Sequence, residues 1–191
     1  MLKATLKIAD LENYDPVAKG SSIQVGESYI RPFQHKSLES SLVKNTEQWF
    51  FVIRERQVAA DEAGVHSVVI AHASMDQFRQ HYQKCMHWPL DFIVIEAARR
   101  GPRLRVRAGY IASLPIYFHV EERTRTVTLS WDFMDLLDKS GTIDTEIIAH
   151  HLSMRTFYSA RQARVGVNLL TAGATLYVDR LSCCRFDGHR D

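Results

Sequence analysis

The densest cluster of side chains that could bind a ligand is a run of arginines. Its members are Arg99, Arg100, Arg103, Arg105 and Arg107. Guanidinium groups hold carboxylates and phosphates through paired hydrogen bonds, so the run could bind an acidic peptide segment, a phosphate or a partner subunit. Alternation along a strand would put Arg103, Arg105 and Arg107 on one face. The alternative is a solvated strand face that acidic side chains on a neighbouring strand balance.

Metal binding is a second chemistry to consider, because His81 and Cys85 are spaced to share one helical face, with His87 nearby. No second pair of ligands stands close in the sequence. Packing or solvent exposure explains such a pair more simply than a metal ion does. We therefore expect no metal site here.

Two other His and Cys groups are weaker candidates. His150 and His151 are adjacent, hence about 100° apart around a helix, and cannot face one ion. Cys183 and Cys184 lie near His189 but lack the Cys-x-x-Cys spacing of metal and redox motifs. A metal or redox role is not expected for either group.

Periodicity predicts the elements that position these groups. Strands are predicted at 2–8, 23–30, 49–53, 66–72, 91–96, 104–108, 115–120, 126–131 and 175–179. Helices are predicted near 74–87, 132–138 and 143–153. Many sequential strands with few helices favour an α+β protein built from antiparallel sheets.

Two of the helices carry start signals. Ser74 and Gln77 have the spacing of a capping box, and Pro89 follows the predicted end of that helix. Thr142 is the expected N-cap of the helix at 143–153. The apolar face expected for this last helix is formed by Ile143, Ile147, Ile148 and Leu152.

Composition narrows the class of protein. The 191 residues are 46% hydrophobic and 24% charged, with a net charge of +2, which is typical of one globular domain and gives no reason to expect a nucleic-acid or membrane partner. We expect a domain at 1–180 and a C-terminal tail or linker at 181–191. Without a secretory leader and with three cysteines, a cytoplasmic location is expected.

A series of short motifs follows residue 90 in a recognisable order. They are Leu90-Asp91-Phe92, Pro115-Ile-Tyr-Phe118, Thr126–Trp131, Ile143-Asp144, Arg155-Thr-Phe157 and Leu170-Thr-Ala-Gly173. Their order and spacing, over about half the chain, resemble the N-terminal class II glutamine amidotransferase domain of asparagine synthetase, β-lactam synthetases and lasso-peptide cyclases. The resemblance implies a four-layer αββα sandwich of antiparallel sheets, the arrangement of Ntn hydrolases.

The residues that this family uses for catalysis are mostly absent. Its nucleophile is an N-terminal cysteine, but Leu2 follows Met1 here. Its oxyanion donors come from an Asn-Gly pair, which this sequence lacks. Only Asp91, which in the family would hold the substrate amino group, is retained. The alternative for Asp91 is a strand-entry carboxylate that caps nearby amides. We therefore expect no glutaminase activity and no catalytic residue.

Two hypotheses for function follow. The first is a non-catalytic amidotransferase-like domain or subunit of an ATP-dependent amide-forming synthetase or cyclase, which seats a substrate, possibly a peptide, and stabilises its partner. ATP and Mg would belong to that partner synthetase domain, because this chain has no Gly-rich pyrophosphate loop and we expect no cofactor for it. The second is a free-standing binding or regulatory module whose arginine-rich strand face holds an anionic ligand or protein.

Overall fold

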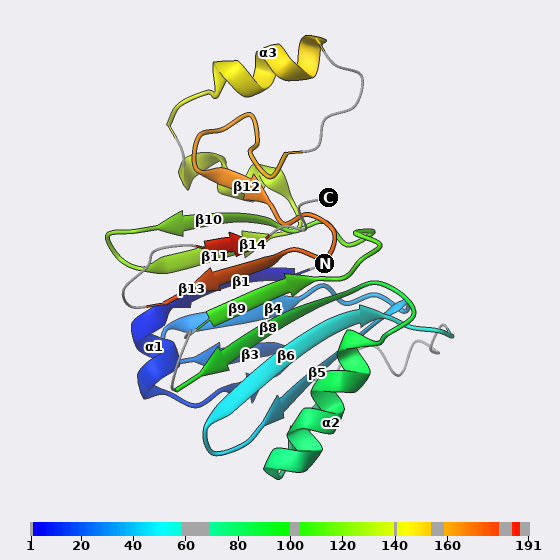
Figure 1. The fold of residues 1–191 in the computed structure, drawn as a ribbon. Helices are drawn as coiled ribbons and strands as arrows, with labels where there is room; N and C mark the ends of the chain where they lie inside the picture. Colours follow the sequence, from blue (N-terminus) through cyan, green and yellow to red (C-terminus); the bar gives the residue numbers. More distant parts are fainter. Residues whose placement is uncertain are drawn as a thin grey trace.

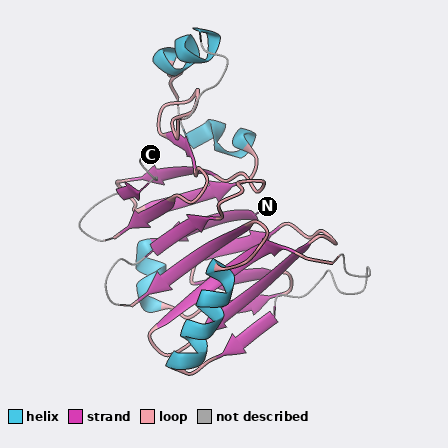
Figure 2. Ribbon diagram, turned by 45° about the vertical axis from the view of Figure 1, so that its right-hand side comes forward, coloured by secondary structure: helices cyan, strands magenta, loops and turns pink. Residues whose placement is uncertain are grey.

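Two stacked β-sheets form the body of the molecule (Figures 1 and 2). The structure is a computed structural model that describes residues 2–58, 69–99, 104–139, 141–153, 159–179 and 185–187. Each sheet has seven strands, and few helices accompany them. The fold is therefore α+β, as the strand-rich pattern predicts.

Sheet A has the order β12-β10-β11-β1-β4-β3-β2, and all its pairs are antiparallel. Its strands are β1 (Leu2–Lys7), β2 (Val17–Lys19), β3 (Ser22–Val25), β4 (Ser28–Pro32), β10 (Tyr117–Glu121), β11 (Thr126–Ser130) and β12 (Val167–Leu169). The first strand lies at the centre of this sheet. Its strict alternation of buried and half-buried residues matches the period of two in the sequence.

Sheet B has the order β14-β13-β9-β8-β6-β5-β7. Its strands are β5 (Leu38–Lys44), β6 (Gln48–Glu55), β7 (Val69–His72), β8 (Phe92–Ala98), β9 (Leu104–Ala108), β13 (Thr175–Val178) and β14 (Arg185–Asp187). The expectation of purely antiparallel sheets is wrong for one pair, because β5 and β7 are parallel. Residues 185–187, expected to lie in a tail, pair with β13 at the edge of this sheet.

The main core lies between the two sheets. Sheet A contributes residues such as Leu6, Ile30 and Val127, and sheet B contributes residues such as Phe51 and Ile95. Each of these five residues is 0% exposed. Burying one such side chain stabilises the fold by about 1.5–3 kcal/mol relative to leaving it in water. This shared core holds the sheets together and therefore fixes where their ends meet.

A second, smaller core lies on the outer face of sheet B, under helix α2 (Met75–Met86). Phe78 and Tyr82 of this helix contact Phe50 edge-on, with ring centroids 5.0 and 5.5 Å apart. The predicted capping box is confirmed, since the Gln77 amide donates to the Ser74 hydroxyl and the Ser74 amide donates to the Gln77 side chain. One helix thus covers β5, β6 and β8.

The outer face of sheet A has a lighter cover. The predicted helix near 132–138 is a 3-10 helix, η2 (Phe133–Lys139), and Phe133 packs edge-on against Tyr117 of β10. Asp135 of η2 accepts bonds from Lys3 and Ser130 of this face, and these bonds lower the pKa of Asp135. The described residues therefore show two sheets with an α-helix outside one and a short 3-10 helix outside the other.

Two further helices lie away from these outer faces. Helix α1 (Ile8–Asn13) follows β1 directly and buries Ile8 and Leu11. Helix α3 (Thr145–Ser153) stands apart from the sandwich beyond β12 in both ribbon views (Figures 1 and 2). The expected N-cap, Thr142, is wrong, and the expected apolar face is only partly buried. Asp144 caps it by accepting from the Ile147 amide. Only Ile147 of the expected face is fully buried, whereas Ile143 and Leu152 are exposed.

Candidate functional site

The end of the sandwich where β8 begins holds Asp91. The topology brings the start of β1 to this same end. Lys3 of β1 lies opposite Ser130, and Ser130 lies opposite Tyr117, the first residue of β10. The chain reaches Tyr117 from β9 through the loop 109–116, which crosses from sheet B to sheet A beside Asp91. Strand pairing alone therefore gathers the start of β1, the start of β8 and this loop.

Asp91 is 1% exposed and ties the crossing loop to sheet B. Its Oδ2 accepts a hydrogen bond of 2.8 Å from the Leu114 amide and one of 3.1 Å from the Ser113 hydroxyl. The loop is also held through its backbone, because the Gly109 amide donates to the carbonyl of Phe92 at 2.8 Å. These contacts are those of a carboxylate that caps amides at a strand entry.

Glu55, at the end of β6, joins this group. Its Oε1 accepts from the Ser113 hydroxyl at 2.9 Å, and its Oε2 accepts from the Asp91 amide at 3.3 Å. A serine hydroxyl has a single proton, so Ser113 can donate to only one of the two carboxylates at a time. Two acidic groups thus share one donor, and Asp91 Oδ1 is buried with no hydrogen-bond partner among the described residues.

The backbone of the crossing loop is constrained as well. Ala112 has a positive φ of 56°, a left-handed conformation that residues with a Cβ rarely adopt. Gly109 is required where it stands, since a Cβ there would come within 2.2 Å of Asp91 Oδ1. Strained backbone of this kind persists only where surrounding contacts impose it, and here the bonds of Asp91 and Glu55 impose it.

No attacking group is assembled at this end in the described residues. Leu2, the first described residue of β1, is a hydrocarbon side chain that is 0% exposed. Ser113 is exposed, but its partners are both carboxylates, whereas an activated serine pairs with a histidine or lysine base. The geometry at the Asp91 end thus suits binding or support better than nucleophilic catalysis.

The arginine run is divided by the fold. Arg100 and Arg103 lie outside the described residues. Arg99 follows β8 at the end of the sandwich opposite Asp91, and its Nη2 lies 2.7 Å from Asp15 Oδ1. A cavity of about 420 Å³ opens there, between the loop 14–16, the turn 44–49 and the end of β8. Its lysine, Lys44, donates to the carbonyl of Pro16 at 3.3 Å.

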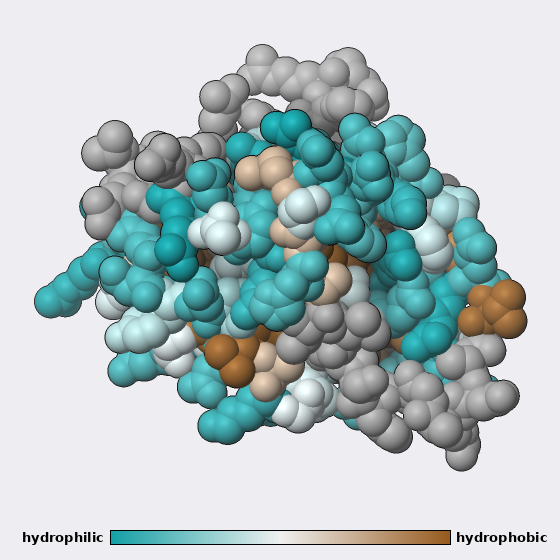
Figure 3. Space-filling model, turned by 90° about the horizontal axis from the view of Figure 1, so that it is seen from below, coloured by the Kyte–Doolittle hydropathy of each residue, from teal (hydrophilic) through white to brown (hydrophobic). Residues whose placement is uncertain are grey.

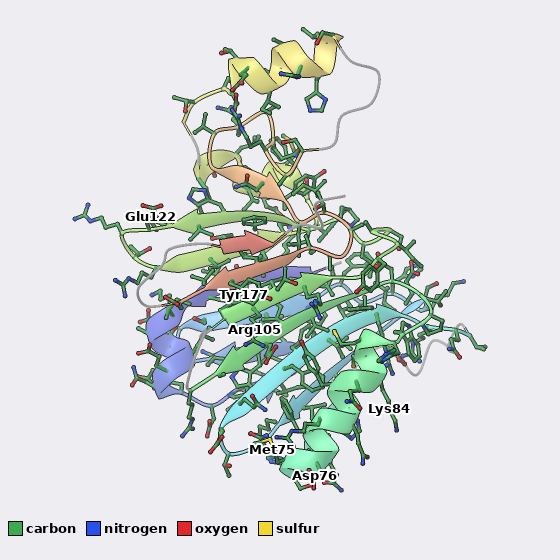
Figure 4. All side chains as sticks on the ribbon, in the orientation of Figure 1. Met75, Asp76, Lys84, Arg105, Glu122 and Tyr177 are labelled. Carbon is green, nitrogen blue, oxygen red and sulfur yellow. The ribbon has the colours of Figure 1, made fainter. Side chains whose placement is uncertain are left out.

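Arg105 and Arg107 lie on the outer face of β9, and the buried Leu104 and Val106 face the core, as alternation predicts. Figure 4 shows Arg105 beside Tyr177 of the neighbouring strand β13, and its guanidinium carbon lies 5.7 Å from the centroid of that ring. Glu96 of β8 lies 3.5 Å from Arg105 Nη1, so an acidic neighbour does balance part of this face.

These side chains line a small cavity of about 70 Å³ beside α2. The lining also includes Tyr82, Val94 and Thr175. Burial, together with the negative charge of Glu96, raises the pKa of Tyr82 to about 12, so its hydroxyl stays protonated at neutral pH. Arg107 Nε donates to the Thr175 hydroxyl at 3.1 Å. The cavity is therefore polar, and the Tyr82 hydroxyl remains a donor across the physiological pH range.

The groups considered for metal binding do not come together. His81 is exposed, whereas Cys85 is buried against sheet B, where burial raises the pKa of its thiol. In the described ranges, no three His, Cys, Asp or Glu side chains are grouped as a metal site would require. Cys183, Cys184 and His189 lie outside those ranges. Within the same ranges, no helix has the length and apolar character to cross a membrane.

The surface seen from below is mostly hydrophilic (Figure 3). Apolar side chains on this face form small separate spots over the described residues. Larger exposed apolar groups occur at the Asp91 end, where Tyr110 and Ile111 of the crossing loop are 68% and 59% exposed.

Sequence patterns point to Asp91 and to the arginines, but not to their partners. Glu55 and Ser113 are 36 and 22 residues away from Asp91 in the chain, and Glu96 lies on the strand before the arginines. Period-two alternation places Glu96 on the same face as Val94, yet nothing in the sequence shows that β9 lies beside β8 in the register that sets Glu96 opposite Arg105. Pairing register decides these contacts.

Comparison with known proteins does not assign the chain to a family. A scan against protein-family models finds no match, and a search of curated proteins finds none either.

Proposed function

We propose that this chain is a non-catalytic amidotransferase-like domain or subunit of an ATP-dependent amide-forming synthetase or cyclase. In this role it would seat a substrate and stabilise the adenylating partner, which would supply ATP and Mg. The finer fold proposal goes with it: the two stacked sheets would be a reduced form of the αββα sandwich of Ntn hydrolases.

One observation carries the proposal. The start of a central strand, β1, lies at the same end of the two-sheet sandwich as Asp91. In the family that the sequence resembles, the nucleophile at the start of the chain and the substrate-holding aspartate are expected to work together. Here the aspartate is present at that end, whereas Leu2 is a buried hydrocarbon. The arrangement supports a retained scaffold without the attacking group.

The loss of glutaminase chemistry is compatible with such a partner. An enzyme that joins an amine and a carboxylate of the same substrate needs no ammonia, so the glutaminase residues are free to change. The exposed Tyr110 and Ile111 beside Asp91 offer apolar contact area for the adenylating domain. Asp91 then acts by holding the crossing loop in the shape that this domain contacts.

The test combines two assays. Purified protein incubated with glutamine should release no ammonia above a heat-killed control. The chain should also increase ATP-dependent pyrophosphate release by the synthetase half, identified by its Ser-Gly-Gly-x-Asp loop on the same or a neighbouring reading frame. Ammonia release would overturn the loss of catalysis, and an unchanged rate of pyrophosphate release would overturn the partnership.

A matched pair of variants locates the effect. Asp91→Asn removes the charge at the buried end of the sandwich and should reduce the stimulation of the synthetase. Asp76→Asn makes the same chemical change on α2, where the Asp76 side chain is 88% exposed, and should leave it unchanged. If the two variants stimulate the synthetase equally, Asp91 does not take part in the proposed contact.

A second candidate function is favoured by the two arginines on the outer face of sheet B. We infer that a free-standing binding module could use this face to hold an anionic ligand. The supporting observation is that Arg105 and Arg107 line one polar cavity whose lining contains a single negative charge, that of Glu96. This function needs no synthetase partner, and binding of an anion in the absence of ATP would favour it.

A further inference from the structure

The cavity beside α2 contains two buried polar atoms without partners. Glu96 Oε2 and Arg105 Nε are both inaccessible to water, and neither has a hydrogen-bond partner among the described residues. A buried acceptor or donor left unpaired destabilises a protein by about 1–3 kcal/mol. One atom needs a donor and the other needs an acceptor, so a single occupant with both kinds of group would satisfy the two.

Charge narrows the choice of occupant. Two arginines face one glutamate in the cavity, and Tyr82 is neutral at physiological pH, since its pKa is about 12. The lining therefore has an excess of one positive charge. Arg107 adds donors, because its Nε is engaged by Thr175, while the partner of its Nη1 among the described residues is the sulfur of Met86 at 3.2 Å, a weak acceptor. An anion with several acceptor oxygens fits this set of donors.

The size of the cavity limits the choice of occupant further. A water molecule needs about 10–15 Å³ of such space, so a cavity of about 70 Å³ holds several waters or one small tetrahedral group. A bulky ligand cannot enter whole. A larger molecule could place only its anionic head between α2 and the strands β9 and β13.

We propose that this cavity is a binding site for a phosphate group that retains a proton, either hydrogen phosphate or a phosphate monoester. Its oxygens accept from the guanidinium groups of Arg105 and Arg107, and its P–OH donates to the Glu96 carboxylate, with the side chains of Arg105 and Glu96 turning so that Nε and Oε2 face the occupant. Sulfate and carboxylates have no proton to donate at neutral pH. Glu96 would therefore repel them while it accepts a bond from phosphate, and the site selects by protonation as well as by charge.

This inference rests on the second candidate function and names its ligand class, and it does not depend on a synthetase partner. The two can fail separately. If sulfate and an acidic peptide bind as well as phosphate does, the arginine face is an anion site but the selection by Glu96 is wrong. If no anion binds, both are wrong.

The experiment is isothermal titration calorimetry of the purified protein with inorganic phosphate, phosphoserine, sulfate and a peptide of glutamates, in a buffer without phosphate. Phosphate is expected to bind at least tenfold more tightly than sulfate. Phosphoserine and inorganic phosphate distinguish the two sources when they are compared at about pH 6, where roughly half of the monoester retains its proton. Under this condition phosphoserine binds only if the cavity mouth admits the organic part.

Variants identify the groups. Arg107→Met should weaken phosphate binding at least tenfold, whereas Arg79→Met, which changes an exposed arginine of α2, should not. Glu96→Gln is nearly isosteric and replaces the acceptor with an amide that can donate. It should therefore bind sulfate more tightly and lose the preference for phosphate, whereas Glu122→Gln at the exposed turn after β10 should change neither.

Folding of each variant is checked by circular dichroism and thermal unfolding before titration. Because Glu96→Gln predicts a gain of sulfate binding, a misfolded variant cannot imitate the expected result. Phosphate binding that Arg107→Met leaves intact, or a preference for phosphate that Glu96→Gln leaves intact, would overturn the proposal.

Discussion

Asp91 and Asp144 do the same chemical task in two different regions of the molecule. Asp91 accepts from the Leu114 amide at 2.8 Å, and Asp144 accepts from the Ile147 amide at 3.2 Å. Asp91 is buried at the end of the sandwich. Asp144 lies at the start of α3, away from the sandwich. Its own side chain is 11% exposed, and its arginine partner Arg161 is 52% exposed. The carboxylates are alike, but their surroundings differ.

The difference shows how burial sets the value of a contact. At the Asp91 end, removing the carboxylate would leave an amide buried without a partner, because water cannot replace the lost acceptor. At α3, water and salt can take over from Asp144, and the exposed ion pairs of Arg161 with Asp144 and Glu146 are screened. We therefore expect the Asp91 end to determine global stability and α3 to respond locally.

The largest expected effect tests how tightly the Asp91 end is packed. Gly109→Ala would place a Cβ 2.2 Å from Asp91 Oδ1 and 3.0 Å from the Phe92 amide nitrogen. The Asp91 carboxylate cannot easily move away, because its other oxygen, Oδ2, accepts from Ser113 and Leu114. Overpacking of this kind should lower the free energy of unfolding by about 3 kcal/mol, measured by urea denaturation. Gly141→Ala is the control, because nothing lies within 4 Å of that position. Equal stability of the two variants would show that the loop is free to move.

A smaller loss is expected from Asp91→Ala. The Leu114 amide would stay buried without an acceptor, so the free energy of unfolding should fall by about 2 kcal/mol. The same denaturation experiment measures it, with Asp76→Ala on the exposed face of α2 as the control. If Asp91→Ala unfolds at the same denaturant concentration as the control, the carboxylate does not hold the loop.

Helix α2 offers an intermediate case, since its cap is exposed but the helix itself is packed on sheet B. Ser74→Ala removes the hydroxyl that accepts from the Gln77 amide and should destabilise the protein by about 1 kcal/mol. Ser74→Gly should have a smaller effect, because glycine is tolerated at an N-cap. Thermal unfolding compares the two. A larger loss with glycine would argue against the capping box as the cause.

The smallest effect is expected at α3 and depends on pH. Hydrogen bonds from Arg161 and from the Ile147 amide lower the pKa of Asp144 below its ordinary value of 3.8. The stabilisation from Asp144 is therefore complete above pH 3.8 and is lost as the pH falls through the lower pKa of the folded state. The protection factors of the α3 amides, which are exchange rates corrected for the intrinsic rate at each pH, should therefore fall as the pH is lowered from 5 to 2.

Arg161→Ala is the matching variant for this titration. It should raise the pKa of Asp144 toward its ordinary value and move the loss of protection in α3 to higher pH, while the sandwich amides keep their protection. A coupled loss of protection in α3 and in the sandwich would contradict the contrast between the two regions.

Part of the fold could be predicted from local patterns. The alternation in β1, the capping box of α2 and the two faces of β9 each follow from periods of two or of three to four residues, which depend only on neighbours in the chain. Helix α3 shows the limit of such patterns. Its apolar spacing predicts a face against a core, but the helix stands away from the sandwich and leaves Leu152 84% exposed.

The site was less predictable than the elements that form it. Asp91 could be singled out because it is part of the motif Leu90-Asp91-Phe92, and the arginines because five of them occur within nine residues. The surroundings of these side chains depend on how the strands pair. Arg99 and Arg105 are close in sequence, yet one lies beside Asp15 near α1 and the other lies beside Glu96 on the face that α2 partly covers. No local pattern distinguishes these two environments.

By itself, the sequence determined the α+β fold class, most of the strands, the start of α2 and the absence of an Asn-Gly pair, because composition and short-range periodicity carry that information. Tertiary structure alone decided that Glu55 and Asp91 share the hydroxyl of Ser113 and that Glu96 faces two arginines. The physical reason is that strand register and the crossing between sheets bring distant residues to hydrogen-bond distance, and both are settled by burial of the common core.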